Sequence, residues 1–155
     1  MRYVCRVLRL SNRGRYALKA VYDLAQHADA PAQVREVAAR QHIPLRFLEQ
    51  IFQLLKRARL VESKRGPKGG FVLVREPDQV KLGDVLRAVE GPVVLTGPTR
   101  KSVRREDPPG GDVTEAVLAD LSRSVEQCFD GITVQDLCAR QERVALMRRP
   151  ASYVI

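Results

Sequence analysis

One segment, residues 42–74, limits the possible folds of this chain more than any other part. Within it, apolar residues recur every three or four positions between 45 and 60, at Leu48, Ile51, Phe52 and Leu55. This spacing predicts a helix with one buried face. The opposite face carries Arg46, Glu49, Gln50, Gln53 and Arg57. Such side chains can read base edges, but a solvated polar face has the same pattern, so the flanking segments must decide.

The segment before this helix predicts a partner helix. Residues 33–41 carry a short apolar stripe at Val34, Val37 and Ala38. A short turn follows, and Pro44 stands at the opening of the next helix, where its missing N–H has no intrahelical partner. Two short helices joined by such a turn form a helix-turn-helix, whose second helix enters the DNA major groove.

The segment after the helix predicts a β-hairpin. Residues 60–65 and 71–74 flank the Gly- and Pro-rich turn 66–70, and the tip carries Lys64, Arg65 and Lys68. A basic hairpin behind a helix-turn-helix is a wing. A Gly-rich turn can also bind nucleotide phosphates, but that site needs a strand that leads into a helix, and here a strand leads into a strand.

The charge balance favours a polyanionic partner. The 155 residues include 27 Lys and Arg against 18 Asp and Glu, giving a net charge of +9 and a pI near 10.0. The basic residues cluster near the N-terminus, at 56–59, at 64–68 and at 100–105. Since many proteins carry solvated lysines, this distribution supports the hairpin and helix patterns without standing alone.

The cysteines and histidines indicate neither a metal site nor a catalytic one. Cys5, Cys128 and Cys138 lack the close spacing of zinc ligands, and this sparse, odd number suits the reducing cytoplasm. No apolar run approaches the roughly 18 residues of a membrane span, so a cytoplasmic protein is expected. His27 and His42 have no nucleophile or paired carboxylate near them in sequence, so we expect no enzyme.

The first helix is expected at about residues 13–28, because Ser11 and Asn12 are good N-caps. Arg13, Arg15 and Tyr16 lie at its beginning, where side chains and helix N–H groups commonly meet phosphate. An ordinary exposed first turn is an equally good explanation. Residues 1–10 precede this start as an N-terminal extension, and residues 81–90 form a short structural helix after the wing.

The remainder predicts a loop and a long helix. Residues 91–111 are rich in Pro and Gly and form a long connection, of a kind that is usually functional or disordered. A helical pattern resumes at 112–129, with Leu118, Leu121, Val125 and Cys128 spaced by three, four and three residues. This seam fits pairing across a dimer, and burial in the chain's own core fits equally well. A last helix, 133–141, is capped by Thr133 with Asp136 at its third position.

The predicted fold is therefore mainly α with a small β-hairpin. A winged helix-turn-helix domain at 11–90 is followed by the loop 91–111, and a dimerisation helix and C-terminal segment occupy 112–155.

Several of these motifs together resemble a known family. The segments SNRGRYAL at 11–18, FLEQIF at 47–52 and RGPKGGF at 65–71 are similar to those of the bacterial winged-helix regulators of the Rrf2 type, which include IscR, NsrR and CymR. The segment ITVQDL at 132–137 also matches. Family members begin two or three residues before the position of Ser11, which makes residues 1–7 an extra segment or a misassigned start.

The resemblance implies a homodimer, joined through the long helix, that binds a two-fold symmetric operator. By position, Arg46, Glu49 and Gln50 would lie in the major groove and Arg65 in the adjacent minor groove. Pro44 replaces the small polar residue that is common in the family.

The resemblance fails at the sensor. Iron–sulfur members hold their cluster with three closely spaced cysteines in the loop that is 91–111 here, and this loop has none. Because such clusters need thiolate ligands, we expect no cluster and no other cofactor. Cys128 and Cys138 lie at apolar helix positions and are interpreted as small core residues.

The primary hypothesis is a dimeric DNA-binding transcription regulator that acts as a repressor without a cluster. One alternative is a module that regulates a partner enzyme, as CymR does, through the loop 91–111. Another is a thiol sensor that uses Cys128 or Cys138.

Overall fold

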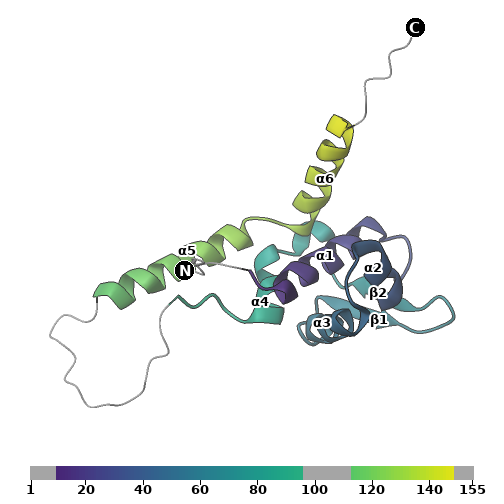
Figure 1. Ribbon diagram of the computed structural model, residues 1–155, viewed down its shortest axis with the longest axis horizontal. Coiled ribbons are helices and arrows are strands. Elements are labelled where there is room, and N and C mark those ends of the chain that lie inside the picture. Colours follow the sequence, from purple (N-terminus) through teal and green to yellow (C-terminus); the bar gives the residue numbers. More distant parts are fainter. Residues whose placement is uncertain (1–9, 96–112, 149–155) are drawn as a thin grey trace, which may run out of the picture.

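The computed structural model describes residues 10–95 and 113–148 (Figure 1). Its elements in chain order are α1 (Asn12–Gln26), α2 (Val34–Gln41), α3 (Leu45–Arg57), β1 (Val61–Lys64), β2 (Gly70–Leu73), a 3-10 turn at Pro77–Gln79, α4 (Leu82–Glu90), α5 (Val113–Asp130) and α6 (Val134–Arg148). The two strands form one antiparallel hairpin. The prediction of a mainly helical fold with a small hairpin is confirmed.

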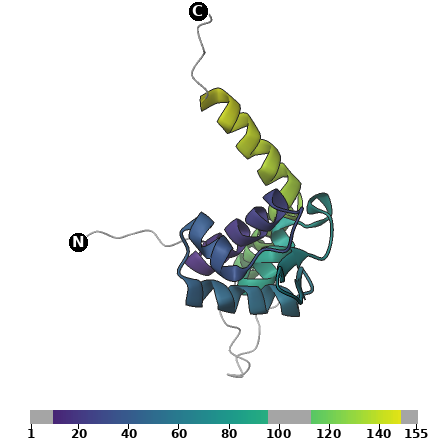
Figure 2. The same ribbon diagram turned by 90° about the vertical axis from the view of Figure 1, so that its right-hand side faces the viewer.

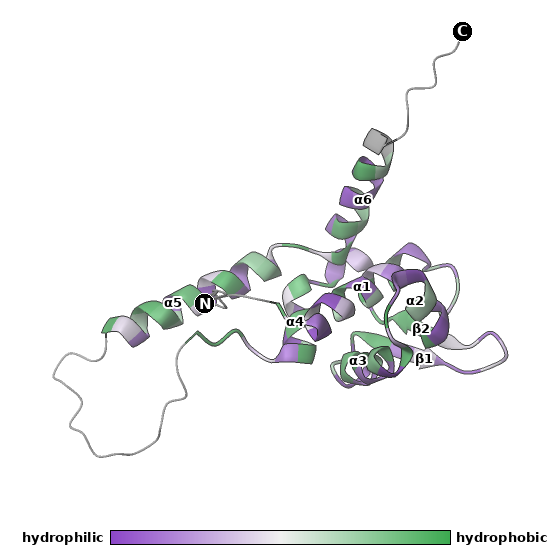
Figure 3. Cartoon of the chain, in the orientation of Figure 1, coloured by the Kyte–Doolittle hydropathy of each residue, from purple (hydrophilic) through white to green (hydrophobic). Residues whose placement is uncertain are grey.

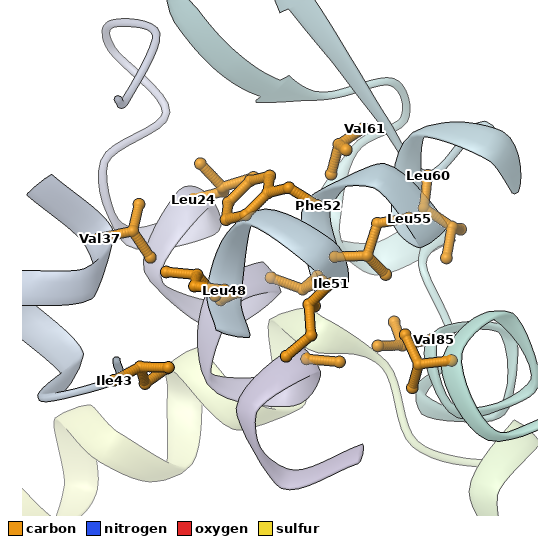
Figure 4. Close-up of a cluster of buried hydrophobic side chains, with 14 of the residues drawn as sticks. Leu24, Val37, Ile43, Leu48, Ile51, Phe52, Leu55, Leu60, Val61 and Val85 are labelled. Atoms are coloured by element: carbon orange, nitrogen blue, oxygen red, sulfur yellow. The ribbon is translucent and has the colours of Figure 1, made fainter. Parts of the chain in front are cut away.

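The core lies where α1, α3 and α4 meet (Figure 4). The predicted apolar face of α3 is fully buried: Leu48, Ile51, Phe52 and Leu55 are each at most 1% exposed. From α1, the small side chains Ala17, Ala20 and Val21 are buried against it. Because one face of α3 is committed to this core, its other face must point outward.

A buried carboxylate joins α1 to α2. Asp23 is 1% exposed, and it accepts hydrogen bonds from Arg40 at 2.6 and 3.1 Å and from the side-chain amide of Gln41 at 2.9 Å. A buried charge is tolerated when it is paired and hydrogen-bonded in this way. The hydrogen bonds that Arg40 donates to Asp23 raise the pKa of Arg40. The network fixes the orientation of α2 on α1.

Most of the expected helix ends are confirmed. Ser11 caps α1 and accepts from the backbone N–H groups of Arg13 and Gly14. At the start of α6, the hydroxyl of Thr133 accepts from the N–H of Asp136, and the Asp136 carboxylate accepts from the N–H of Thr133 at 2.8 Å. The backbone N–H and the hydroxyl of Thr133 both donate to this carboxylate, and these bonds lower the pKa of Asp136.

Two helix ends differ from expectation. The third helix ends at Arg57 and not near Leu60, because Arg59 adopts a left-handed conformation with φ 56°. The N–H of Arg59 donates to the carbonyl of Lys56, and the N–H of Leu60 donates to the carbonyl of Leu55, both at 3.0 Å. This pair of hydrogen bonds is a Schellman motif. The last helix runs to Arg148 and not only to Gln141, because neither Gly nor Pro interrupts residues 142–148.

The helices α5 and α6 extend away from the body in different directions and meet it at their junction (Figures 1 and 2). There, Leu82 donates its N–H to Ile132 and Val134 donates to Val80, each at 2.9 Å. Arg87 of α4 donates to the Asp130 carboxylate at 2.7 Å. This hydrogen bond lowers the pKa of Asp130. Within residues 10–95 and 113–148, no helix is long and apolar enough to cross a membrane.

Candidate nucleic-acid interface

The predicted helix-turn-helix is formed by α2 and α3. His42 ends α2 in a left-handed conformation with φ 53°. The N–H of Ile43 then bonds the carbonyl of Ala38 at 3.0 Å, and the Ile43 side chain is 4% exposed. Pro44 is the N-cap of α3. The turn is therefore fixed by one left-handed residue and one buried side chain, and it holds α3 at a set angle to α2.

The outer face of α3 carries the polar residues that the sequence pattern placed there. Arg46, Glu49, Gln50, Gln53 and Arg57 are all exposed. Four of them, together with Val34 of α2, line an open hollow. The structure thus brings the candidate base-reading residues onto one surface. This surface offers donors from Arg, an acceptor from Glu, and both from Gln, which is the set needed to distinguish base pairs in the major groove.

The predicted wing is present as β1 and β2. Val61 pairs with Leu73 at the base and Lys64 with Gly70 near the tip. Gly66 has φ 120°, a region that favours glycine, and the N–H of Gly69 closes the turn on its carbonyl at 2.9 Å.

The three basic residues of the wing differ in their surroundings. Lys64 forms an ion pair with Glu62 of the same strand. Arg65 and Lys68 are exposed, and neither forms an ion pair with another residue that the structure describes. Arg65 and Lys68 are therefore the wing cations whose charge is fully available to a phosphate or a groove edge.

The wing is anchored to the helix-turn-helix. Ala32, just before α2, exchanges two backbone hydrogen bonds with Phe71 of β2, at 2.8 and 3.0 Å. Gly70 makes this possible, because a Cβ at this position would lie 2.5 Å from the Ala32 backbone. Lys56 of α3 also donates to the Ser63 hydroxyl of β1 at 2.9 Å. The wing is thus tied to the helix-turn-helix at two places, before α2 and at the end of α3.

The beginning of α1 differs from a free phosphate site. Arg13 and Arg15 are exposed as expected, but the first N–H groups of the helix are already used. Ser11 accepts from two of them, and the carboxylate of Glu90 accepts from Gly14 at 2.9 Å. A phosphate at this end would meet side chains in place of the helix N–H groups that the sequence pattern suggested. Tyr16 is partly buried.

The long helix α5 divides its apolar residues between two faces. Of the expected seam, Leu118 and Val125 are partly buried, whereas Leu121 and Cys128 are exposed. Val113, at 72%, and Val117, at 51%, continue the exposed face toward the helix start. These two valines were missed in the seam, although the i, i+4 spacing of residues 113, 117 and 121 could have revealed them. Figure 3 shows hydrophobic colouring along α5.

The body-facing side of α5 has polar partners. Ser122 is buried, and its hydroxyl accepts from the N–H of Leu95 at 3.0 Å. Glu126 accepts from the N–H of Val93 at the same distance. The start of the loop 91–111 therefore lies along α5. The remainder of that loop, the extension 1–9 with Cys5, and residues 149–155 lie outside the described residues.

The two described cysteines have different environments. Cys138 is 6% exposed, which confirms its interpretation as a core residue. Cys128 is exposed in this chain, so the same interpretation is wrong for it. It lies on the outward face of α5, at a position that the chain's own body does not cover. In the described ranges, no three His, Cys, Asp or Glu residues are grouped as a metal site.

Comparisons with known proteins agree with this geometry. The profile of the Rrf2 family, described as iron-dependent transcriptional regulators, matches residues 10–140. The HTH-type transcriptional regulator IscR of Sodalis glossinidius is 36% identical over 92% of this chain and 86% of the relative. The IscR of Aliivibrio salmonicida is 37% identical over 87% of this chain and 80% of that relative.

Solved structures give the same result. T. potens IscR matches with a TM-score of 0.73 and 34% identity, covering 88% of this chain and 90% of the other. CymR, the global cysteine regulator of B. subtilis, matches with a TM-score of 0.68 and 31% identity. The match covers 86% of this chain and 98% of CymR. These proteins are regulators and not enzymes. The chain belongs to the Rrf2 family and is a DNA-binding, winged-helix transcription regulator.

Proposed function

We propose that this regulator is a homodimeric, cytoplasmic repressor that binds a two-fold symmetric operator without an iron–sulfur cluster. The observation that carries the dimer is the outward face of α5, where Val113, Val117 and Leu121 are 72%, 51% and 49% exposed. Aligned apolar residues on a projecting helix are costly in water, and a second copy of α5 would cover them. Residues 11–90 then form the DNA-binding domain and residues 112–155 the dimerisation segment.

On this proposal, the outer face of α3 enters the major groove. Arg46, Glu49 and Gln50 contact base edges, and Gln53 and Arg57 continue the contact along the groove. A dimer presents two such helices, so the operator consists of two inverted half-sites.

The remaining proposed contacts lie beside this helix. Arg65 reaches the adjacent minor groove, while Lys64 and Lys68 bind phosphates. Arg13 and Arg15 bind phosphates through their side chains. The ring of Tyr16 packs edge-to-face on Phe47 of α3 at 5.6 Å, which keeps this end of α1 beside the reading helix.

The cluster-free assignment rests on the donor set. Cys5, Cys128 and Cys138 are the only cysteines of the sequence, and none lies in 91–111. Cys128 and Cys138 are on separate helices, and Cys138 is buried. Iron–sulfur clusters are held mainly by thiolates, so these residues do not fit one. On this proposal the protein binds DNA without any cluster.

The test uses reduced, metal-free, full-length protein. Light scattering should give twice the chain mass of 17.4 kDa. A gel shift on the DNA immediately upstream of the protein's own gene should show saturable, competable binding that weakens as salt rises. A monomeric mass would contradict the dimer. If binding appears only after iron and sulfide are added, the cluster-free assignment is wrong. Increased transcription from that promoter in vitro would contradict repression.

A second function is favoured by the exposure of Cys128. Cys128 lies on the face of α5 that the proposed dimer uses, so we expect its oxidation by peroxide to alter the dimer. We compare DNA affinity before and after peroxide treatment in the parent and in a Cys128→Ser, Cys138→Ser variant. Thiol sensing predicts a response in the parent alone, and an equal response in both proteins excludes it.

A further inference from the structure

The hollow on the outer face of α3 contains one apolar side chain. Its lining consists of Arg46, Glu49, Gln50 and Gln53 together with Val34, and its volume is about 610 Å³. Val34 is the first residue of α2. Every other side chain of this surface can donate or accept a hydrogen bond, so the valine needs a different kind of partner.

The position of Val34 is not explained by the core alone. The core residues of α2 are Val37, at 0%, and Ala38, at 7%. Val34 packs against the edge of that core but stays partly buried, with its remaining surface facing the hollow. A capping box fixes this helix start: Glu36 accepts from the N–H of Gln33 at 2.8 Å. The valine is therefore held in place at the edge of the reading surface.

Base chemistry identifies the partner. In the major groove only thymine presents a methyl group, at C5, while the other base edges present hydrogen-bonding atoms. We propose that Val34 is a specificity-determining residue that contacts the C5-methyl group of a thymine in each operator half-site. The polar residues of the hollow read neighbouring base edges, and Val34 adds a preference for thymine at one position. This inference rests on the proposed binding of a two-fold operator.

The experiment first selects duplexes from a random-sequence library with the full-length protein. Each thymine of the selected half-site is then replaced in turn by deoxyuridine, which removes only the methyl group. We expect one replacement to weaken binding by about fourfold, the factor for one methyl group withdrawn from apolar contact. The Val34→Ala variant should bind the thymine and uracil duplexes at that position equally. Val34→Ser, which lacks both methyl groups and is tolerated in the first turn of a helix, replaces it if the alanine variant is unstable.

Val93→Ala is the matched control, because Val93 is also partly buried but lies outside the hollow. It should keep the fourfold sensitivity to uracil. A selected half-site without thymine, or a Val34 variant that keeps the sensitivity of the parent, would overturn the inference while leaving the DNA-binding function intact. Failure of the library to yield any specific duplex would overturn both.

Discussion

At the scale of single residues, the buried charge of Asp23 is a test of how α2 is held on α1, since this side chain is only 1% exposed. Removing one partner of a buried ion pair costs roughly 3–5 kcal/mol, because the other charge is left without compensation. The Arg40 side chain is 34% exposed, so solvent screens part of this loss. We expect Arg40→Ala to lower the free energy of unfolding by about 2 kcal/mol, measured by urea denaturation.

Arg35→Ala provides the comparison, because Arg35 is exposed on the same helix. Its effect should stay within about 0.5 kcal/mol. Equal losses in the two variants would mean that the Asp23 network contributes no more than an ordinary surface residue.

Contacts to DNA can also be separated residue by residue. A residue that binds phosphate contributes to the salt dependence of affinity, whereas a residue that reads a base contributes to discrimination. For Lys68, which is proposed to bind a phosphate, Lys68→Ala should weaken binding and reduce the salt slope by about 0.9. Gln50→Ala should reduce discrimination between base pairs by about 1–3 kcal/mol without changing the slope.

Arg143→Ala controls for the change in net charge, since Arg143 is exposed on α6, away from the proposed interface. The measurement is a titration of fluorescent duplex at several salt concentrations. If Arg143→Ala reduces the slope as much as Lys68→Ala does, the effect reflects overall charge and not a contact at the wing.

Individual residues differ in how far the sequence predicts them. The faces of α3 were predictable because a 3.6-residue period directly separates Leu48 or Phe52 from Gln50. The Asp23 network was not, because Arg40 lies 17 positions away and no local pattern connects the two. Likewise, Glu90 reaches the start of α1 from 76 positions beyond Gly14. Long-range polar pairs depend on tertiary packing, which a single sequence does not reveal.

At the scale of elements, α3 ends in a turn where a residue other than glycine has a left-handed conformation. Arg59 has φ 56°, a conformation that costs an ordinary L-residue about 1 kcal/mol and costs glycine almost nothing. Arg59→Gly should therefore raise the free energy of unfolding by about 0.5–1 kcal/mol. Thermal and urea denaturation without DNA measure it.

Arg57→Gly, in the last turn of the same helix, should have the opposite sign, because glycine there loses about 0.5–1 kcal/mol of helix propensity. Destabilisation by both variants would show that the left-handed conformation at position 59 carries no strain.

The junction of α4 with α5 should respond to pH. Arg87 holds the pKa of Asp130 below its ordinary value of 3.8. Because the folded state binds the proton less readily than the unfolded state, this contribution is complete above pH 3.8 and is lost as pH falls through the folded pKa. Asp130→Asn should therefore destabilise the protein at neutral pH, and its difference from the parent should shrink below pH 3.8.

Urea denaturation at several pH values measures this difference, and Asp29→Asn controls for the loss of a carboxylate elsewhere. A difference for Asp130→Asn that stays constant through the acid range would show that its charge does not act at the junction.

Element boundaries were predictable where the chain carries a local signal. Ser11 and the Thr133–Asp136 pair gave correct starts because capping is a local interaction. The end of α3 was set too late, since the chain turns at Arg59 without the glycine that usually marks such an ending. The end of α6 was set too early, because polar residues such as Glu142 and Arg143 continue a helix as well as they form a loop.

At the scale of the whole molecule, the proposed dimer depends on α5, which would set how the α3 helices of the two chains are presented to DNA. The sequence predicted a seam at Leu118, Leu121, Val125 and Cys128. In the structure, the outward face contains Leu121 and Cys128 from this set, together with Val113 and Val117. Two short repeats could not distinguish the covered face from the exposed one, because that depends on how residues 91–95 and α4 cover α5. The exposed face is therefore the better target for a test of assembly.

Val117→Glu places a charge at the middle of this face, where the parent side chain is 51% exposed. Burying it in a dimer would be costly, so the variant should be monomeric by light scattering yet folded by circular dichroism. Because a dimer binds both half-sites at once, its affinity for a full operator should fall by about 10²- to 10⁴-fold. Affinity for an isolated half-site duplex should not change, since α3 and the wing are untouched. Gln135→Glu, an exposed change of equal charge on α6, should leave both affinities at the parent level. A monomeric Val117→Glu protein that binds the full operator like the parent would mean that each chain recognises DNA independently of α5.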